Sequence, residues 1–182
     1  GGSVLNMSAV HVGRESGGEG TVTVTGANSY LRTGSFNIGG SSQSGFTGTG
    51  TLIISDGGTV DSFASFVGRR GTGTASVTGA GSSWDINGRL LVGERNSGLL
   101  TIADGGVVNA TEGALGQSAD GIGTVLVDGT DARWNISDDL FVGLGGEGSL
   151  TVSNGGHVAV GGTLHITEVN ASVTGTVYIG SD

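Results

Sequence analysis

Apolar and polar residues alternate along most of this chain, in short runs that end at glycine. The alternation has the period of an extended strand, in which successive side chains point to opposite faces, and not the period of a helix. It therefore predicts an all-β protein. The inward pairs expected in the first strand of four repeats are Val22 and Val24, Leu52 and Ile54, Leu100 and Ile102, and Leu150 and Val152.

The strand pattern recurs at a nearly fixed spacing. The segment 73–93, GTASVTGAGSSWDINGRLLVG, returns 50 residues later as 123–143, GTVLVDGTDARWNISDDLFVG. Three short strands separated by glycine-rich corners are predicted in each repeat, and the repeats start near residues 20, 50, 73, 98, 123, 148 and 175. Such a period is typical of stacked repeat architectures. We therefore expect residues 1–182 to form one right-handed parallel β-helix (β-solenoid) of about seven coils, with roughly 26 residues in each.

One inward position alternates between large and small side chains from coil to coil. Its members, in chain order, are Val60, Trp84, Val108, Trp134 and Val158. Such alternation lets neighbouring layers interdigitate in a packed core. Trp84 and Trp134 are therefore predicted to be core residues whose indole N–H groups need partners. If they were exposed instead, they would be platforms on which sugars could stack.

The first and last segments of the chain resemble two halves of one coil. The opening GGSVLNMSAVHVG matches the second half of a repeat, with Val4 at the position of Val60, and the closing GTVYIGSD matches the first half. We therefore expect end-to-end association of separate chains or a longer continuous array, with open strand edges at the junction. The residues expected to stack there are Gly1, Gly2, Val4, Val10, Val12, Gly175, Val177, Ile179 and Asp182.

Composition narrows the classes of partner. The chain has 16 acidic and 7 basic residues and a formal net charge of −9, and its basic residues are all arginine. We therefore expect neither nucleic-acid binding nor membrane insertion. The 40 glycines occur without a single proline, which excludes collagen and proline-rich disorder. Without cysteine the chain has no disulfide framework and no thiolate metal site.

The residues form no pattern typical of catalysis, so we expect neither an enzyme nor a bound cofactor. His11, His157 and His165 fall at outward strand positions of different coils, as solvated surface histidines do. No metal site is expected, and the weak candidate, for calcium, is the acidic pair Asp138 and Asp139. The outward positions of the first strands are rich in threonine, which β-propensity by itself explains.

The segment 71–93, GTGTASVTGAGSSWDINGRLLVG, resembles the repeats of bacterial autotransporter passengers and, more closely, the type V secretion and PEP-CTERM-associated repeat. The GTLIISDGG and GSLTVSNGG units are similar to the same family. This resemblance implies a right-handed β-helix, export, and a place on the bacterial cell surface or in the extracellular matrix. It also implies the role of an adhesin or stalk, without shared catalytic residues.

We therefore predict that the chain is a structural repeat segment of a bacterial extracellular fibre, stalk or adhesin, and that its partner is itself. The functional residues are then the residues that stack neighbouring coils on one another. The alternative is a surface binding module that recognises host or matrix glycans through its loops or its threonine-rich face. In that case the ligand contacts lie on the loops after the third strand of each coil or on the threonines.

Overall fold

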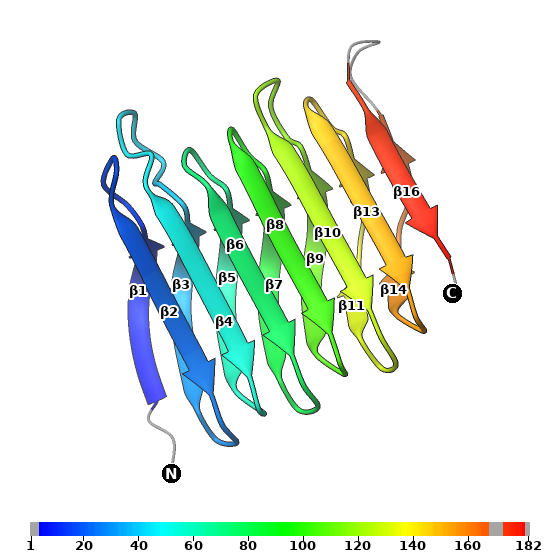
Figure 1. The fold of residues 1–182 in the computed structure, drawn as a ribbon, viewed down its shortest axis with the longest axis horizontal. Coiled ribbons are helices and arrows are strands. Elements are labelled where there is room, and N and C mark those ends of the chain that lie inside the picture. Colours follow the sequence, from blue (N-terminus) through cyan, green and yellow to red (C-terminus); the bar gives the residue numbers. More distant parts are fainter. Residues whose placement is uncertain (1–3, 168–172, 181–182) are drawn as a thin grey trace.

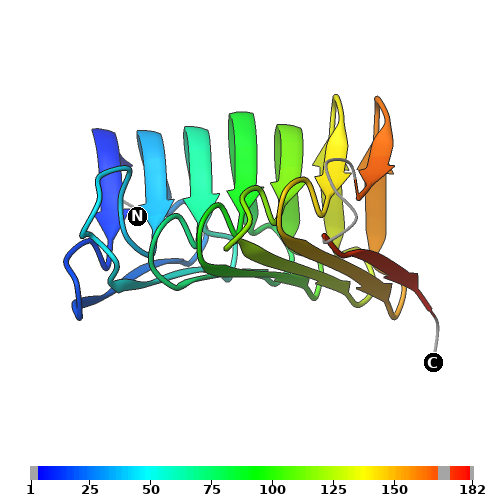
Figure 2. The same cartoon turned by 90° about the horizontal axis from the view of Figure 1, so that it is seen from above.

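The computed structural model describes residues 4–167 and 173–180, which form a β-solenoid built from two parallel sheets (Figure 1). Sheet A contains β1 (Val4–Val12), β3 (Tyr30–Ile38), β5 (Thr59–Val67), β7 (Ser83–Val92), β9 (Val107–Leu115), β11 (Arg133–Ile136), β12 (Leu140–Val142), β14 (His157–Val160) and β15 (Leu164–Ile166). Sheet B contains β2 (Glu19–Thr25), β4 (Thr49–Ser55), β6 (Gly73–Thr78), β8 (Ser97–Ala103), β10 (Ile122–Asp128), β13 (Glu147–Ser153) and β16 (Gly175–Ile179). Figure 2 shows the sheets as two layers joined by loops.

The chain winds in one constant sense. In Figure 1 the strands of sheet B run downward in front, and the chain returns upward behind them through sheet A while it advances from left to right. This winding is right-handed, as is usual for crossovers between parallel strands. The stack has about seven turns of about 25 residues. The predicted fold class, a right-handed parallel β-helix, is confirmed.

The number of strands per coil differs from the prediction of three. In the coils of β3, β5, β7 and β9 the second and third strands are one strand of 9 or 10 residues. A bulge between Ile86 and Arg89 gives β7 one additional residue, so this strand bends without leaving the sheet. In the next two coils the strands are separate, and Asp139 Oδ1 accepts a hydrogen bond of 2.7 Å from the Thr163 backbone N–H at that break.

The inward side chains of sheet B form two columns along the stack. The register places Val22, Leu52, Ala75, Leu100, Val125, Leu150 and Val177 in one column, and Val24, Ile54, Val77, Ile102, Val127, Val152 and Ile179 in the other. Leu52, Ile54, Leu100 and Ile102 are fully buried. Burial of such a side chain contributes about 1.5–3 kcal/mol, and it is complete only because a neighbouring coil covers each face.

Two rows of glycine meet where sheet A passes into sheet B. The seven predicted coil starts fall on one of them, a column of Gly20, Gly50, Gly73, Gly98, Gly123, Gly148 and Gly175. A Cβ atom on Gly98 would lie 2.1 Å from the carbonyl oxygen of Val67 and 2.5 Å from the amide nitrogen of Gly93. Gly93, in the other row, has a φ of 74°. Only glycine lets the two strands cross this closely.

Both tryptophans are fully buried in sheet A, in the column that the sequence predicts. The Trp84 Nε1–H donates a hydrogen bond of 3.1 Å to Ser62 Oγ in the preceding coil. Trp84 also packs edge-to-face on Phe36, with ring centroids 6.1 Å apart. Trp134 is the equivalent residue two coils later. Its Nε1 is buried without a hydrogen-bond partner among the described residues.

The unpaired Trp134 indole leads to a stability prediction. Ala110 occupies the column of Ser62, since both pair with Ile86, so a hydroxyl at residue 110 would face Trp134 as Ser62 faces Trp84. We expect Ala110→Ser to raise the free energy of unfolding by about 1 kcal/mol because it satisfies a buried donor. Urea-induced unfolding followed by circular dichroism measures the change.

The matched control is Ala75→Ser, another buried alanine replaced by serine. Ala75 lies in a column of sheet B between Leu52 and Leu100, so a new hydroxyl there would be surrounded by aliphatic side chains. We expect this variant to lose about 1–3 kcal/mol. Equal losses in the two variants would contradict the proposed partnership between residue 110 and Trp134.

Candidate functional site

At the N-terminal end of the described stack, sheet A extends one strand further than sheet B. Strand β1 covers β3 in sheet A, whereas β2 is the outermost strand of sheet B. A hollow of about 360 Å³ opens beside β2 and includes Val22, Val24 and Leu31 in its lining. Val24 and Leu31 are buried, and Val22 is half-buried against the core. The apolar interior of the described stack is therefore open beside the free edge of β2.

At the C-terminal end the arrangement is reversed. Strand β16 extends sheet B beyond β13, and β14 and β15 are the outermost strands of sheet A. Ile179, which continues the column of Val152, is 78% exposed. Leu164 and Ile166 of β15 are 41% and 48% exposed. Within residues 4–167 and 173–180, no polar residues cover the core columns at this end.

The two ends are complementary in their strands. One end carries the additional strand in sheet A and the other carries it in sheet B. Of the residues expected at the junction, Val12 is buried, Val10 and Val177 are half-buried, and Gly175 lies in the glycine column. Residues 1, 2 and 182, where Gly1, Gly2 and Asp182 were expected to stack, lie outside the described residues.

The position of Val4 corrects the sequence alignment by one residue. Val4 pairs with Tyr30, and Leu5 pairs with Leu31, which in turn pairs with Val60. Leu5 therefore holds the register position in the tryptophan column that the sequence assigned to Val4. The sequence alignment matched the glycine pair that opens the chain with the glycine pair of a later repeat. The register in the structure is instead set by the pairing along β1, which ends with Val12 opposite Ile38.

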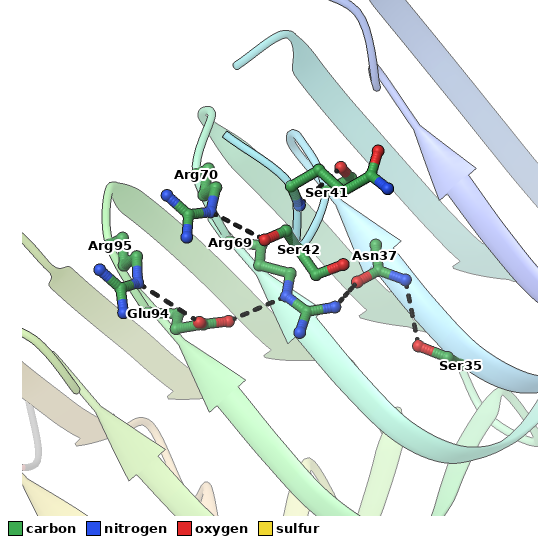
Figure 3. Close-up of polar contacts among 9 residues, drawn as sticks. Ser35, Asn37, Ser41, Ser42, Arg69, Arg70, Glu94 and Arg95 are labelled. Atoms are coloured by element: carbon green, nitrogen blue, oxygen red, sulfur yellow. Dashed lines mark hydrogen bonds and ion pairs between the residues drawn. The ribbon is translucent and has the colours of Figure 1, made fainter. Parts of the chain in front are cut away.

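The loops after sheet A hold a network of charged and polar side chains centred on Arg69 (Figure 3). The Arg69 Nε–H donates a hydrogen bond of 3.0 Å to Glu94 Oε2, and its Nη1 donates to Asn37 Oδ1. The Arg69 guanidinium carbon lies 3.8 Å from the centre of the Phe66 ring. Arg95 Nε lies 3.8 Å from the other oxygen of Glu94. These contacts tie three successive coils together, so we interpret the network as structural support.

A second arginine holds the longest loop, residues 39–48. The Arg70 Nε–H donates a hydrogen bond of 3.2 Å to the carbonyl oxygen of Ser42. The pKa of His11, at the same edge, lies below its usual value. Partial burial is the main cause, and the guanidinium groups of Arg14 and Arg69 add to it. The loop edge is therefore ordered by its own contacts, and His11 tends to stay neutral at this edge.

The candidate calcium residues are engaged with the protein. Asp139 Oδ1 accepts the Thr163 N–H, and its Oδ2 lies 3.8 Å from His165 Nε2. The exposed Asp138 lies directly before it, in the bend between β11 and β12. Among the described residues, no group of three or more histidine, cysteine, aspartate or glutamate side chains is arranged to hold a metal ion. His165 stacks on Phe141, with ring centroids 4.6 Å apart, and His157 is exposed on β14.

The threonine-rich face is the outward surface of sheet B. One of its columns passes through Thr21, Thr51 and Thr74 and is then interrupted by Leu99, which is 39% exposed. The array of hydroxyl groups is therefore discontinuous along the stack.

Comparison of the chain with protein families, with curated proteins and with solved structures finds no match. The resemblance to autotransporter repeats accordingly stays a prediction from sequence. Within residues 4–167 and 173–180 there is no helix of the length and apolarity that crossing a membrane would require.

Proposed function

We propose that this chain is a structural segment of a bacterial extracellular fibre, stalk or adhesin, in which the solenoid continues beyond the described coils. The observation that carries the proposal is the pair of open, complementary ends. Strand β16 of a second copy, or of a further repeat, fits the free edge of β2 in sheet B. Strand β1 in turn fits the free edge of β14 and β15 in sheet A.

Physical chemistry favours such a junction. Free strand edges present unpaired backbone N–H and C=O groups, which pair readily with another strand. The exposed side chains of Leu164, Ile166 and Ile179 would be buried by the same contact. The placement outside the cell is supported by the resemblance of the repeats and agrees with the absence of cysteine. A rod of this kind bears load because many backbone hydrogen bonds along its axis share it.

Self-association tests the proposal directly. We expect sedimentation velocity to show oligomers that grow with concentration, and electron microscopy to show unbranched rods. Ile179→Lys should raise the dissociation constant at least about tenfold, because it places a charge in the apolar junction. A chain that stays monomeric up to about 1 mM would rule out end-to-end assembly of separate copies.

Tyr178→Lys is the matched control. Tyr178 is the neighbour of Ile179 on β16, is 59% exposed, and pairs with Thr151 in an outward column. The two variants carry the same charge on the same strand but on opposite faces. Association of Tyr178→Lys should stay close to that of the natural chain. If both variants associated equally weakly, net charge and not the core junction would be responsible.

A further inference from the structure

The outer face of sheet A is hollowed where its strands bend. One hollow, of about 720 Å³, lies over β1, β3 and β5 and includes Arg32, Asp61 and Phe63. A second, of about 350 Å³, lies over β7, β9 and β11 and includes Asn109 and Asn135. Both are lined by Asn87 of the β7 bulge, so they lie next to each other along the solenoid axis. We call this surface the sheet A trough.

The floor of the sheet A trough is a ladder of polar side chains, one from each of five successive coils. The register aligns Arg32, Asp61, Asp85, Asn109 and Asn135 in a single outward column. The Asn135 amide donates a hydrogen bond of 2.8 Å to Asn109 Oδ1, and the Asn109 amide donates one of 2.6 Å to Asp85 Oδ1. These bonds use one N–H and one oxygen lone pair of Asn109, whose amide has two of each. The ladder can therefore bind polar ligand groups at the spacing of the coils.

The same arrangement continues around Asp61. Its two carboxylate oxygens accept hydrogen bonds of 3.1 Å from the Asn87 amide and 3.2 Å from the Tyr30 hydroxyl. Desolvation, and next the carboxylate of Asp61, raise the pKa of Tyr30 above its usual value, so the hydroxyl stays a donor. The ladder side chains from Asp61 to Asn135 are thus held by hydrogen bonds before any ligand arrives, which lowers the entropic cost of binding.

An aromatic side chain stands at the edge of this polar floor. Phe63 is 67% exposed, although it lies in the interior of the described stack and not at an end. Its neighbours explain the exposure, because Gly34 lies opposite it in β3 and a Cβ atom on Gly88 of β7 would be 3.9 Å from its ring. Glycine on both sides leaves the ring uncovered. Contact with water is unfavourable for a phenyl ring, so a ligand that covers this ring with an apolar face would gain binding free energy.

The chemistry of the trough selects among ligand classes. One arginine and two aspartates in the ladder give no positive field, which disfavours nucleic acids and polyanions. A protein interface of standard size has an apolar core, whereas this floor consists of amides and carboxylates. A sugar ring has an apolar C–H face and a rim of hydroxyl groups, and it fits an aromatic wall above a polar floor. A linear chain of sugars would also follow the axial direction of the trough.

We propose that the sheet A trough binds an uncharged linear polysaccharide along the solenoid axis, with Phe63 stacking on a sugar ring and the Asp61 to Asn135 ladder binding hydroxyl groups. This inference goes beyond the proposed structural role. It places glycan recognition on sheet A, away from both the loops and the threonine-rich face. A fibre with this property would carry one binding trough in every repeat of the chain along its length.

Native gels that contain soluble polysaccharides test the proposal. The probes are hydroxyethylcellulose, galactomannan and mixed-linkage β-glucan as neutral chains, and polygalacturonate and dextran sulfate as charged ones. We expect at least one neutral probe to retard the protein and the charged probes to leave its mobility unchanged. Phe63→Ala should raise the dissociation constant for that neutral probe at least about tenfold.

Two further variants distinguish the trough from the rest of the surface. Asn87→Ala removes an exposed amide from the centre of the trough and should weaken binding by about tenfold or less. Leu99→Ala removes an exposed apolar side chain from sheet B and should leave binding unchanged. Thermal unfolding at the same temperature in all three variants shows that each is folded.

Three results would overturn the proposal. They are the absence of retardation by every neutral probe, stronger retardation by the charged probes, and unchanged binding by Phe63→Ala. Sedimentation without polysaccharide adds a fourth test. If Phe63→Ala dissociates lateral assemblies of the chain, the trough is a contact between copies and not a glycan site.

Discussion

Alanine in place of Gly98 is expected to lower the free energy of unfolding by about 3 kcal/mol or more. The added Cβ would lie 2.1 Å from the carbonyl oxygen of Val67, well inside the contact distance. That carbonyl accepts a hydrogen bond of 2.7 Å from the Gly93 N–H, so it cannot move without breaking the link between coils. One methyl group at this corner therefore separates two layers of the solenoid. Urea-induced unfolding measured by circular dichroism gives the size of the loss.

The control for this prediction is Gly45→Ala, in the longest loop. A Cβ atom on Gly45 would meet nothing within 4 Å, although its φ is 84°. The variant should therefore lose only about 1 kcal/mol, the cost of a left-handed conformation for a residue with a side chain. If Gly98→Ala were no worse than Gly45→Ala, the crowding at the glycine column would not matter for stability.

Removal of the Trp84 side chain is the second change with a large expected effect. Trp84→Ala should cost about 3–5 kcal/mol, since it leaves a cavity between coils where the indole now packs on Phe36. The loss should exceed that of Trp134→Ala by about 1 kcal/mol, because Trp84 makes a hydrogen bond to Ser62, whereas the Trp134 nitrogen has no hydrogen-bond partner in the described part of the chain. Urea-induced unfolding of both variants gives the comparison.

The pair of tryptophan variants also tests how the coils cooperate. Trp84 lies near the middle of the stack and Trp134 two coils further along. If the coils unfold as one unit, each variant should show a single transition, whereas independent coils would give separate transitions. Equal losses from both variants would show that the Ser62 hydrogen bond contributes nothing to stability.

Strand content and coil boundaries were predictable because they depend on local patterns. Alternation in segments such as 73–93 identifies strands without knowledge of their neighbours, since side chains on a strand alternate whatever it pairs with. The recurring glycine, as at Gly73 and Gly98, marks the corner at which each coil begins. Repetition then supplies the register, because equivalent residues of neighbouring coils must lie side by side.

The sequence did not reveal the sheet A trough, although a signal was present. Asp61, Asp85, Asn109 and Asn135 occupy equivalent places in four successive repeats. An alignment that compared polar positions as well as apolar ones would have shown the column. The hollow itself depends on the bend of the strands and on Gly34 and Gly88, and that shape follows only from the packed coils.

By itself, the sequence determined that this protein is a parallel solenoid whose glycine corners and aliphatic columns repeat along its length. The physical reason is that hydrophobic periodicity specifies which face of each strand is buried. Only the tertiary structure decided where strands merge and that Leu5 and not Val4 is in register with Val60. It also decided that the Trp134 indole N–H has no hydrogen-bond partner among the residues described. Each of these depends on a bulge, on a register shift of one residue or on the direction of a side chain. Such details are set only when one coil packs against the next.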